Sequence, residues 1–374
     1  MLSDCLRGYR VLDLSQYLPG PFAAQILSDL GAEVVKLEPP AGDPMRALGP
    51  RDNAGLSAFY RLVNAGKTVV RVDLKEPAGR QAFEDLVRGA DALVESFRPG
   101  ALAKLGLGPA NLEAINPRLV HCALSGFGQS GPYAKRAGHD ITYMALAGGL
   151  ATSGPAERPV MAHPPTADFA SGVQAALATV AALLRRERSG KGAFLDVSLS
   201  ETVLAWQGAP LTAALRPGWA QARGTWLLNG GAACYQIYET ADGRFVALGA
   251  LEAKFWAAFC RALGRDDWIA RQDEQLPQTS LIAEVAAIIT SLPLGHWEAL
   301  LDGVDCCFQP ILEPDEVPGH PQVRARGLVQ RSSGSEPLVE VLFPALLDGA
   351  PPTPRMPVRE ADVADVVAAW VAGR

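Results

Sequence analysis

The chain has 374 residues, of which 48% are hydrophobic and 20% are charged, and its formal net charge is −6. A chain of this length exceeds the usual limit for one hydrophobic core, so two lobes are expected. The negative charge, without any block of Lys and Arg, argues against nucleic acid as a partner.

The apolar stretches are too short to predict a membrane span. The longest, residues 173–184, is interrupted by Gln174 and Thr179 and falls short of the roughly 20 residues that cross a bilayer. Because the N-terminus also lacks a basic-then-apolar leader, we expect a cytoplasmic protein with no membrane partner. The cysteines are scattered, and the histidines show no metal-binding spacing, so we expect reduced thiols and no metal site.

The first forty residues predict a strand, a helix and a second strand. Residues 10–14 form a short apolar run, residues 22–30 have helical periodicity, and Gly31 ends the helix before an apolar run at 33–37. The turn between the first strand and the helix, LSQYLPGP, lacks the GxGxxG pattern of dinucleotide sites. NAD and FAD therefore have no support from the residues.

The alternation of strands and helices continues along the next 160 residues or so of the chain. Strands are predicted at 69–74, 92–95, 119–124 and 194–199, with helices at 78–88 and 168–188. Repeated βα units predict an α/β fold, with a mainly parallel sheet and helices on both faces. Ligands of such sheets bind beyond the carboxyl ends of the strands, so the segments 38–46, 96–100 and 125–143 are candidates for the site.

The chain is expected to divide into three parts. Residues 1–207 form the large α/β domain, and residues 208–322, which are richer in Trp and Tyr, form a smaller domain with a hairpin that turns at Asp242-Gly243. Residues 323–374 return to the large domain as a proline-rich strap that ends in a helix at 361–371.

Two polar segments stand out as candidates for chemistry. In the glycine-rich stretch 125–150, His139, Asp140 and Tyr143 precede an apolar helical run. Asp168 stands immediately before a long predicted helix, whose first amides can stabilise an oxyanion by roughly 3 kcal/mol per donor. Each residue alone also fits an ordinary helix cap, because Asp is a preferred N-cap.

The sequence resembles the family III CoA-transferase (CaiB/BaiF) superfamily over nearly its whole length. Matching blocks are GYRVLDLSQYLPGPFAAQILSDLGAEVVKLEPPAGDP, VDLKEPAGR, ESFRPGALAKLGLGP, SGFGQSGP, AGHDITY, TADFASG, RSGKGAFLDVSLSE, NGGAACYQIYETADGRFVALGALEAKFW and CCFQPIL. The resemblance implies a Rossmann-like large domain with a smaller α+β domain in an interlocked homodimer. It also implies an acyl-CoA substrate and no cofactor beyond the CoA moiety.

Within this superfamily the sequence is most like the 2-methylacyl-CoA racemases, which carry GHD followed by a tyrosine. Inverting a stereocentre beside a thioester requires a base on each face of the α-carbon. The resemblance places these bases on His139 and Asp168, and it places Glu252 on the His139 imidazole.

A CoA-transferase is the alternative interpretation. In that reaction the Asp140 carboxylate attacks the thioester and forms an acyl anhydride, followed by an aspartyl-CoA thioester. His139 weighs against this alternative, because anhydride chemistry needs no second ionisable group beside the nucleophile.

The resemblance also implies where CoA binds. The adenosine end is expected to contact Val72, Asp73, Leu74 and Lys75. The pantetheine or thioester portion is expected to contact residues 138–143, including Gly138 and Tyr143, and the phosphates are expected to contact Arg46 and Arg98. Guanidinium groups suit phosphate oxygens.

Overall fold

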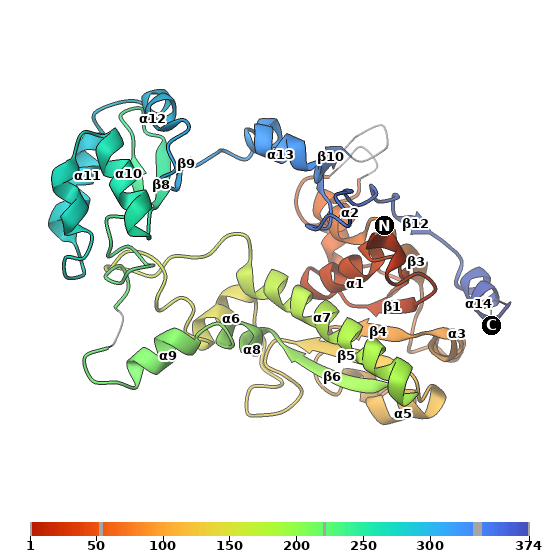
Figure 1. Ribbon diagram of the computed structural model, residues 1–374. Helices are drawn as coiled ribbons and strands as arrows, with labels where there is room; N and C mark the ends of the chain where they lie inside the picture. Colours follow the sequence, from red (N-terminus) through yellow and green to blue (C-terminus); the bar gives the residue numbers. More distant parts are fainter. Residues whose placement is uncertain (1, 52–54, 220–221, 332–338, 373–374) are drawn as a thin grey trace. The chain divides into compact units, whose positions relative to one another are not determined.

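The computed structural model describes residues 2–51, 55–219, 222–331 and 339–372. The chain forms two compact units (Figure 1): the first contains residues 1–147, 163–205 and 318–374, and the second contains residues 148–162 and 206–317. The limits at 206 and 317 lie close to those drawn from composition. Residues 148–162, which the sequence analysis assigned to the large domain, cluster instead with the second unit.

The first unit is built on a seven-stranded sheet in the order β12-β3-β2-β1-β4-β5-β6. All neighbouring strands are parallel, which confirms the predicted α/β class. The strands are β1 (Arg10–Leu14), β2 (Glu33–Glu38), β3 (Thr68–Arg71), β4 (Ala92–Glu95), β5 (Val120–Ser125), β6 (Ala193–Ser198) and β12 (Arg359–Glu360). The proline-rich tail therefore does more than cross the surface, because β12 adds an edge strand beside β3.

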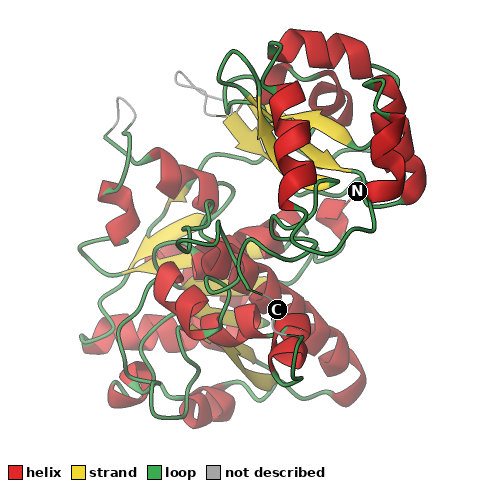
Figure 2. Ribbon diagram, turned by 90° about the vertical axis from the view of Figure 1, so that its left-hand side faces the viewer, coloured by secondary structure: helices red, strands yellow, loops and turns green. Residues whose placement is uncertain are grey.

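Helices cover both faces of this sheet, as Figure 2 shows. On one face, α3, α5 and α14 pack on apolar residues of the strands, including Leu12 and Val35. On the other face, α1 packs against α7 and against the central strands. The helices are α1 (Pro19–Asp29), α2 (Ala58–Asn64), α3 (Pro77–Gly89), α4 (Ala101–Lys104), α5 (Pro109–Ile115), α6 (Asp140–Leu146), α7 (Thr166–Ser189), α8 (Leu199–Leu204), α13 (Pro321–Arg326) and α14 (Val363–Ala372).

Short elements complete the first unit and its links to the second. These are the 3-10 turns η1 (Leu2–Asp4), η2 (Pro44–Ala47) and η4 (Val317–Gly319), and the antiparallel pair β10 (Val329–Arg331) and β11 (Val339–Val341).

Helix α7 is long and apolar enough to cross a membrane by length and composition. Its packing accounts for much of this character, because Ala175, Thr179 and Leu183 are buried while the helix lies on α1, β5 and β6. Val173, Leu177 and Leu184 remain exposed on the helix. The helix therefore contributes side chains to the core of the first unit and also presents an apolar stripe on its surface.

The second unit has its own core around a three-stranded antiparallel sheet, in the order β7-β8-β9. Trp256, Trp268 and Trp297 are buried in this core, and the Trp256 indole donates a hydrogen bond to the Trp268 carbonyl at 3.0 Å. The predicted hairpin is present, with β9 as a third strand. The elements are β7 (Tyr235–Glu239), β8 (Phe245–Gly249), β9 (Phe308–Pro310), α9 (Gly208–Ala214), α10 (Ala253–Ala262), α11 (Thr279–Ile289), α12 (Leu294–Leu301) and the 3-10 helix η3 (Asp266–Arg271).

Candidate functional site

The segment after β5 carries His139 to the start of α6. His139 is the N-cap residue of α6 and has an extended backbone. Its backbone N–H donates to the Thr142 hydroxyl at 3.0 Å, and that hydroxyl donates to the His139 carbonyl at 2.7 Å. The helix start is therefore held by Thr142 and by the backbone, while the His139 residue is exposed and its imidazole is available for chemistry.

A direct hydrogen bond joins the starts of α6 and α7. Asp140 is the first residue of α6, and its Oδ1 accepts the backbone N–H of Asp168 at 3.1 Å. Asp168 lies in the first turn of α7. The structure thus brings together two of the predicted residues, which are separated by the whole segment 141–167, and His139 immediately precedes one of them.

The environment of Asp168 alters its acidity. Burial of its carboxyl group, reinforced by the neighbouring Asp140 carboxylate, raises the pKa of Asp168 to about 6. A carboxyl group with this pKa exchanges a proton readily near neutral pH, as a general acid or base must. The N-cap of α7 is Pro165, so Asp168 is not the helix cap that its place in the sequence suggested.

Tyr143 packs on the glycines that surround this helix junction. A Cβ atom on Gly126 or on Gly138 would lie within 2.6 Å of a ring carbon of Tyr143, so both positions require glycine. Burial raises the pKa of Tyr143 to about 12, the Asp168 carboxylate adds to this effect, and Arg98 opposes it. Asp168 and Arg98 thus both act electrostatically on Tyr143.

Two of the predicted CoA segments follow the carboxyl ends of strands in the sheet, β3 and β4, which are separated by β2 and β1. Residues 72–75 follow β3, where the Lys75 N–H donates to the Asp73 carboxylate at 2.9 Å and shapes the turn into α3. Arg98 follows β4 and is exposed, as is Lys75. These two cations are free to meet phosphate groups at the edge where such folds bind ligands.

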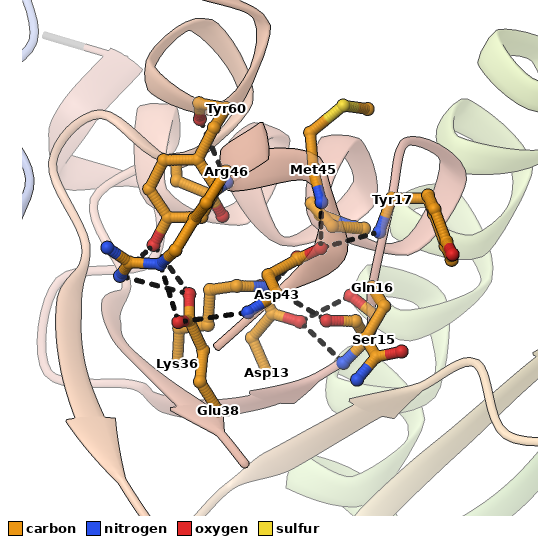
Figure 3. A network of polar contacts seen from close by, with 12 residues as sticks. Asp13, Ser15, Gln16, Tyr17, Lys36, Glu38, Asp43, Met45, Arg46 and Tyr60 are labelled. Carbon is orange, nitrogen blue, oxygen red and sulfur yellow. Dashed lines mark hydrogen bonds and ion pairs between the residues drawn. The ribbon is translucent and has the colours of Figure 1, made fainter. Parts of the chain in front are cut away.

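Arg46, in contrast, is already paired with carboxylates. Its guanidinium makes a bidentate interaction with Glu38, at 2.7 and 3.2 Å, and donates to the Tyr60 hydroxyl at 2.7 Å (Figure 3). It also donates to the Glu360 carboxylate at 2.7 Å. Glu38 is almost fully buried. The interactions of this guanidinium are therefore those of an internal ion pair, and they give no support to a phosphate ligand at this position.

Glu252 lies in the second unit. It is the N-cap residue of α10, is exposed, and makes no side-chain capping bond. Its contact with His139, which lies in the first unit, stays a prediction.

Sequence reasoning missed a cluster of buried charges beside the candidate site. Asp13, Lys36, Lys67 and Asp43 are each at most 3% exposed. The sequence contained a sign of this cluster, because the charged residues Asp13 and Lys36 interrupt otherwise apolar strands. Among the described residues there is no group of three or more His, Cys, Asp or Glu side chains that could hold a metal ion.

Known proteins resemble this chain over most of its length. A family model described as CoA-transferase family III matches residues 6–360. The human alpha-methylacyl-CoA racemase is 36% identical over 330 residues, covering 86% of this chain and 81% of its own. The mouse succinyl-CoA:glutarate CoA-transferase is 34% identical over 340 residues, covering 87% and 78%. A CAIB/BAIF family protein from Brucella suis superposes with a TM-score of 0.85 at 28% identity, covering 98% of this chain and 99% of its own.

Proposed function

Because the chain belongs to the family III CoA-transferases, a family of acyl-CoA racemases and transferases, we propose that it interconverts (R)- and (S)-2-methylacyl-CoA thioesters. The observation that carries this proposal is the junction of α6 and α7. There an exposed His139 adjoins Asp140, which is bonded to the backbone of Asp168, a carboxyl group with a pKa of about 6.

The proposed reaction removes the α-proton on one face of the substrate and returns a proton on the other. The C–H electron pair becomes the enolate, the proton moves to one base, and the second base donates its own proton to the opposite face of the carbon. One of His139 and Asp168 acts as the base and the other as the acid, and the roles reverse for the other enantiomer. Each group contributes roughly 3–5 kcal/mol, so the enolate oxygen also needs hydrogen-bond donors.

The start of α7 is our candidate for stabilising the enolate. The first amides of a helix point their N–H groups outward and favour negative charge. The Asp168 amide is already bonded to Asp140 and the Phe169 amide to the Pro165 carbonyl, so the amides of Thr166 and Ala167 are the candidate donors. The reaction needs no cofactor beyond the CoA moiety of the substrate.

We further propose that the active enzyme is a cytoplasmic homodimer and that Glu252 supports the His139 imidazole. The exposed stripe of Val173, Leu177 and Leu184 on α7 favours a second copy, because soluble proteins seldom leave such contiguous apolar surface uncovered. In the racemase reaction, a carboxylate on the second ring nitrogen of the histidine would select its tautomer.

The alternative is a CoA-transferase with Asp140 as the nucleophile. Its support is the position of Asp140, at the first residue of a helix and beside the Asp168 amide, and the comparable similarity to transferase relatives. The same hydrogen bond occupies one Asp140 oxygen, whereas the half-buried Asp168 has a defined part in the racemase reaction as one of the two bases.

Incubation with one enantiomer of a 2-methylacyl-CoA in D2O separates the two reactions. A racemase incorporates deuterium at the α-carbon and loses optical purity without an acceptor acid. A transferase incorporates none and moves CoA to an added carboxylate such as succinate. The second result would reject our proposal.

Two variants refine this test. His139→Gln is expected to abolish racemisation, and His296→Gln, in the second unit, is a matched control that should leave it unchanged. If His139→Gln still racemises the substrate at the original rate, His139 is not one of the bases.

A further inference from the structure

The loop between β1 and α1, residues 15–18, lies at the point where the strand order of the sheet reverses. The chain moves from β1 outward to β2 and β3, and then returns to the other side of β1 for β4. In open α/β sheets, ligands bind in the crevice at this switch point. The Gln16 N–H donates to the Ser96 hydroxyl at 3.0 Å, which ties the end of β1 to the residue after β4.

Tyr17 in this loop has an unusual backbone conformation. Its φ angle is +63°, in the left-handed region that favours glycine. Such a conformation costs a non-glycine residue free energy and persists where the surroundings over-determine it, often at functional sites. Tyr17 is 45% exposed, and Figure 3 shows its ring pointing away from Asp43, which accepts the Tyr17 N–H at 3.3 Å. Within the described chain the Tyr17 hydroxyl has no hydrogen-bond partner.

A buried charge cluster, formed by Asp13, Lys36, Lys67 and Asp43, holds this loop at several points. The Lys36 ammonium donates to the Ser15 carbonyl at 2.7 Å, and the Lys67 ammonium donates to the Pro21 carbonyl at 2.8 Å. Asp13 accepts the Ser15 N–H at 2.9 Å. With the bond from Tyr17 to Asp43, contacts from two strands and from the segments that carry Asp43 and Lys67 define the path of the chain from 15 to 21.

The charges in this cluster balance one another. Lys67 and Asp13 are 2.8 Å apart, and Lys36 lies 3.1 Å from Asp43 and 3.8 Å from Asp13. Burying two ion pairs gives little net stability, since desolvation offsets their attraction. Such a cluster is better explained by the geometry that it imposes, because removing any one member leaves an unpaired buried charge.

The chemistry of the loop also indicates which part of a substrate it meets. Residues 15–18 carry no charge, whereas the exposed Arg98 follows β4, next to β1, and the exposed Lys75 follows β3, two strands away on the other side. Cations suit the phosphates of CoA, while a phenol and an amide suit its uncharged pantetheine chain.

We propose that Tyr17 is a substrate-contacting residue that hydrogen-bonds the uncharged pantetheine and thioester portion of acyl-CoA, and that the buried charge cluster positions it. Lys36, Lys67 and Asp43 are positioning residues that do not touch the substrate. This inference rests on the proposed function only in taking acyl-CoA as the ligand.

Calorimetric binding of two ligands without a stereocentre at the α-carbon, acetyl-CoA and S-acetylpantetheine, tests the contact. Tyr17→Phe is expected to raise Kd about fivefold for both ligands, as for one ordinary hydrogen bond, because both contain the portion concerned. Arg98→Ala should weaken acetyl-CoA alone. A loss below twofold for either ligand with Tyr17→Phe overturns the contact. If the unaltered protein binds neither ligand, the proposed function itself fails.

The positioning role is tested with Lys67→Met. Its matched control is Arg186→Met, which removes a buried cation paired with Asp91 at 2.9 Å, near the amino ends of the strands. Both variants lose a buried charge, and the melting temperature should fall in each. Only Lys67→Met should raise Kd for both ligands, by about tenfold. Adding Tyr17→Phe to Lys67→Met should raise Kd further by less than the roughly fivefold effect of Tyr17→Phe alone. The cluster does not act through Tyr17 if Lys67→Met and Arg186→Met bind the ligands with equal Kd. The same conclusion follows if the double variant Lys67→Met/Tyr17→Phe shows the full product of the two single increases in Kd.

Discussion

Replacing Asp168 by Asn should remove activity and yet stabilise the protein at neutral pH. The carboxyl group has a pKa of about 6 in the folded chain, because of burial and of the Asp140 carboxylate, against about 4 in an unfolded chain. The folded state thus holds a proton between pH 4 and 6 that the unfolded state has released. The free energy of unfolding therefore falls by up to roughly 3 kcal/mol as the pH rises through this interval.

An uncharged Asn at position 168 does not cause this pH-dependent fall in the free energy of unfolding. We expect Asp168→Asn to unfold with a free energy about 1–3 kcal/mol above that of the unaltered protein at pH 7.5, and with nearly equal stability at pH 4. Urea titrations at the two pH values, followed by circular dichroism, measure both quantities. Deuterium exchange at the α-carbon of the substrate measures the accompanying loss of activity.

Asp13→Asn is the control with the opposite sign. Although burial alone would raise the pKa of Asp13, Lys36 and Lys67 lower it to about 2. Its carboxylate therefore contributes stability above pH 4 that is lost as the pH falls towards 2, and Asp13→Asn should be destabilised at pH 7.5. The expected result is a stability difference between Asp168→Asn and the unaltered protein that is larger at pH 7.5 than at pH 4. If this difference is the same at both pH values, burial and the Asp140 charge do not raise the pKa of Asp168.

Three further substitutions test other parts of the structure. Arg98→Ala should raise KM for an acyl-CoA about tenfold and leave kcat nearly unchanged in steady-state assays, since it removes a contact to a phosphate that does not react; a fall in kcat alone would contradict this. Gly126→Ala places a Cβ atom 2.5 Å from the Tyr143 ring, so kcat/KM should fall by about 10–100-fold, and an unchanged value would show that the ring position is unimportant. Trp370→Ala removes a buried side chain of α14 that bonds Glu33 at 2.8 Å, so urea unfolding should show a loss of about 3–5 kcal/mol, whereas a loss below 1 kcal/mol would mean that α14 is dispensable.

Most of the sheet was predictable because its strands are buried on both faces and form apolar runs between helical segments. β4 begins and ends at the predicted residues, and α3 extends one residue beyond the prediction at each end. β12 was not predicted, since two residues in a proline-rich tail carry no strand pattern and are placed only by pairing with β3. The grouping of residues 148–162 with the second unit was missed for a similar reason: it depends on contacts far along the chain, such as the Arg223 guanidinium on the Pro155 carbonyl.

The sequence predicted which residues form the site, but it did not predict most of the contacts between them. Motif resemblance identified Asp140 and Asp168, but their hydrogen bond requires the packing of α6 on α7. Arg46 was assigned to phosphate because its loop resembles a phosphate-facing segment of the family, and nothing in the local sequence shows that Glu38 and Glu360, far apart in the chain, surround it. Long-range pairing of charges leaves no periodic signal.

The junction of α6 and α7 explains how one scaffold supports both reactions found among the relatives of this chain. Each reaction needs a carboxyl group beside a thioester carbonyl and amides that stabilise an oxyanion. What distinguishes them is where the proton goes: α-proton transfer needs a second group that changes protonation near neutral pH, whereas acyl transfer to a carboxylate does not. Burial of Asp168 and the charge of Asp140 supply a group of this kind, which the proposed racemisation would use.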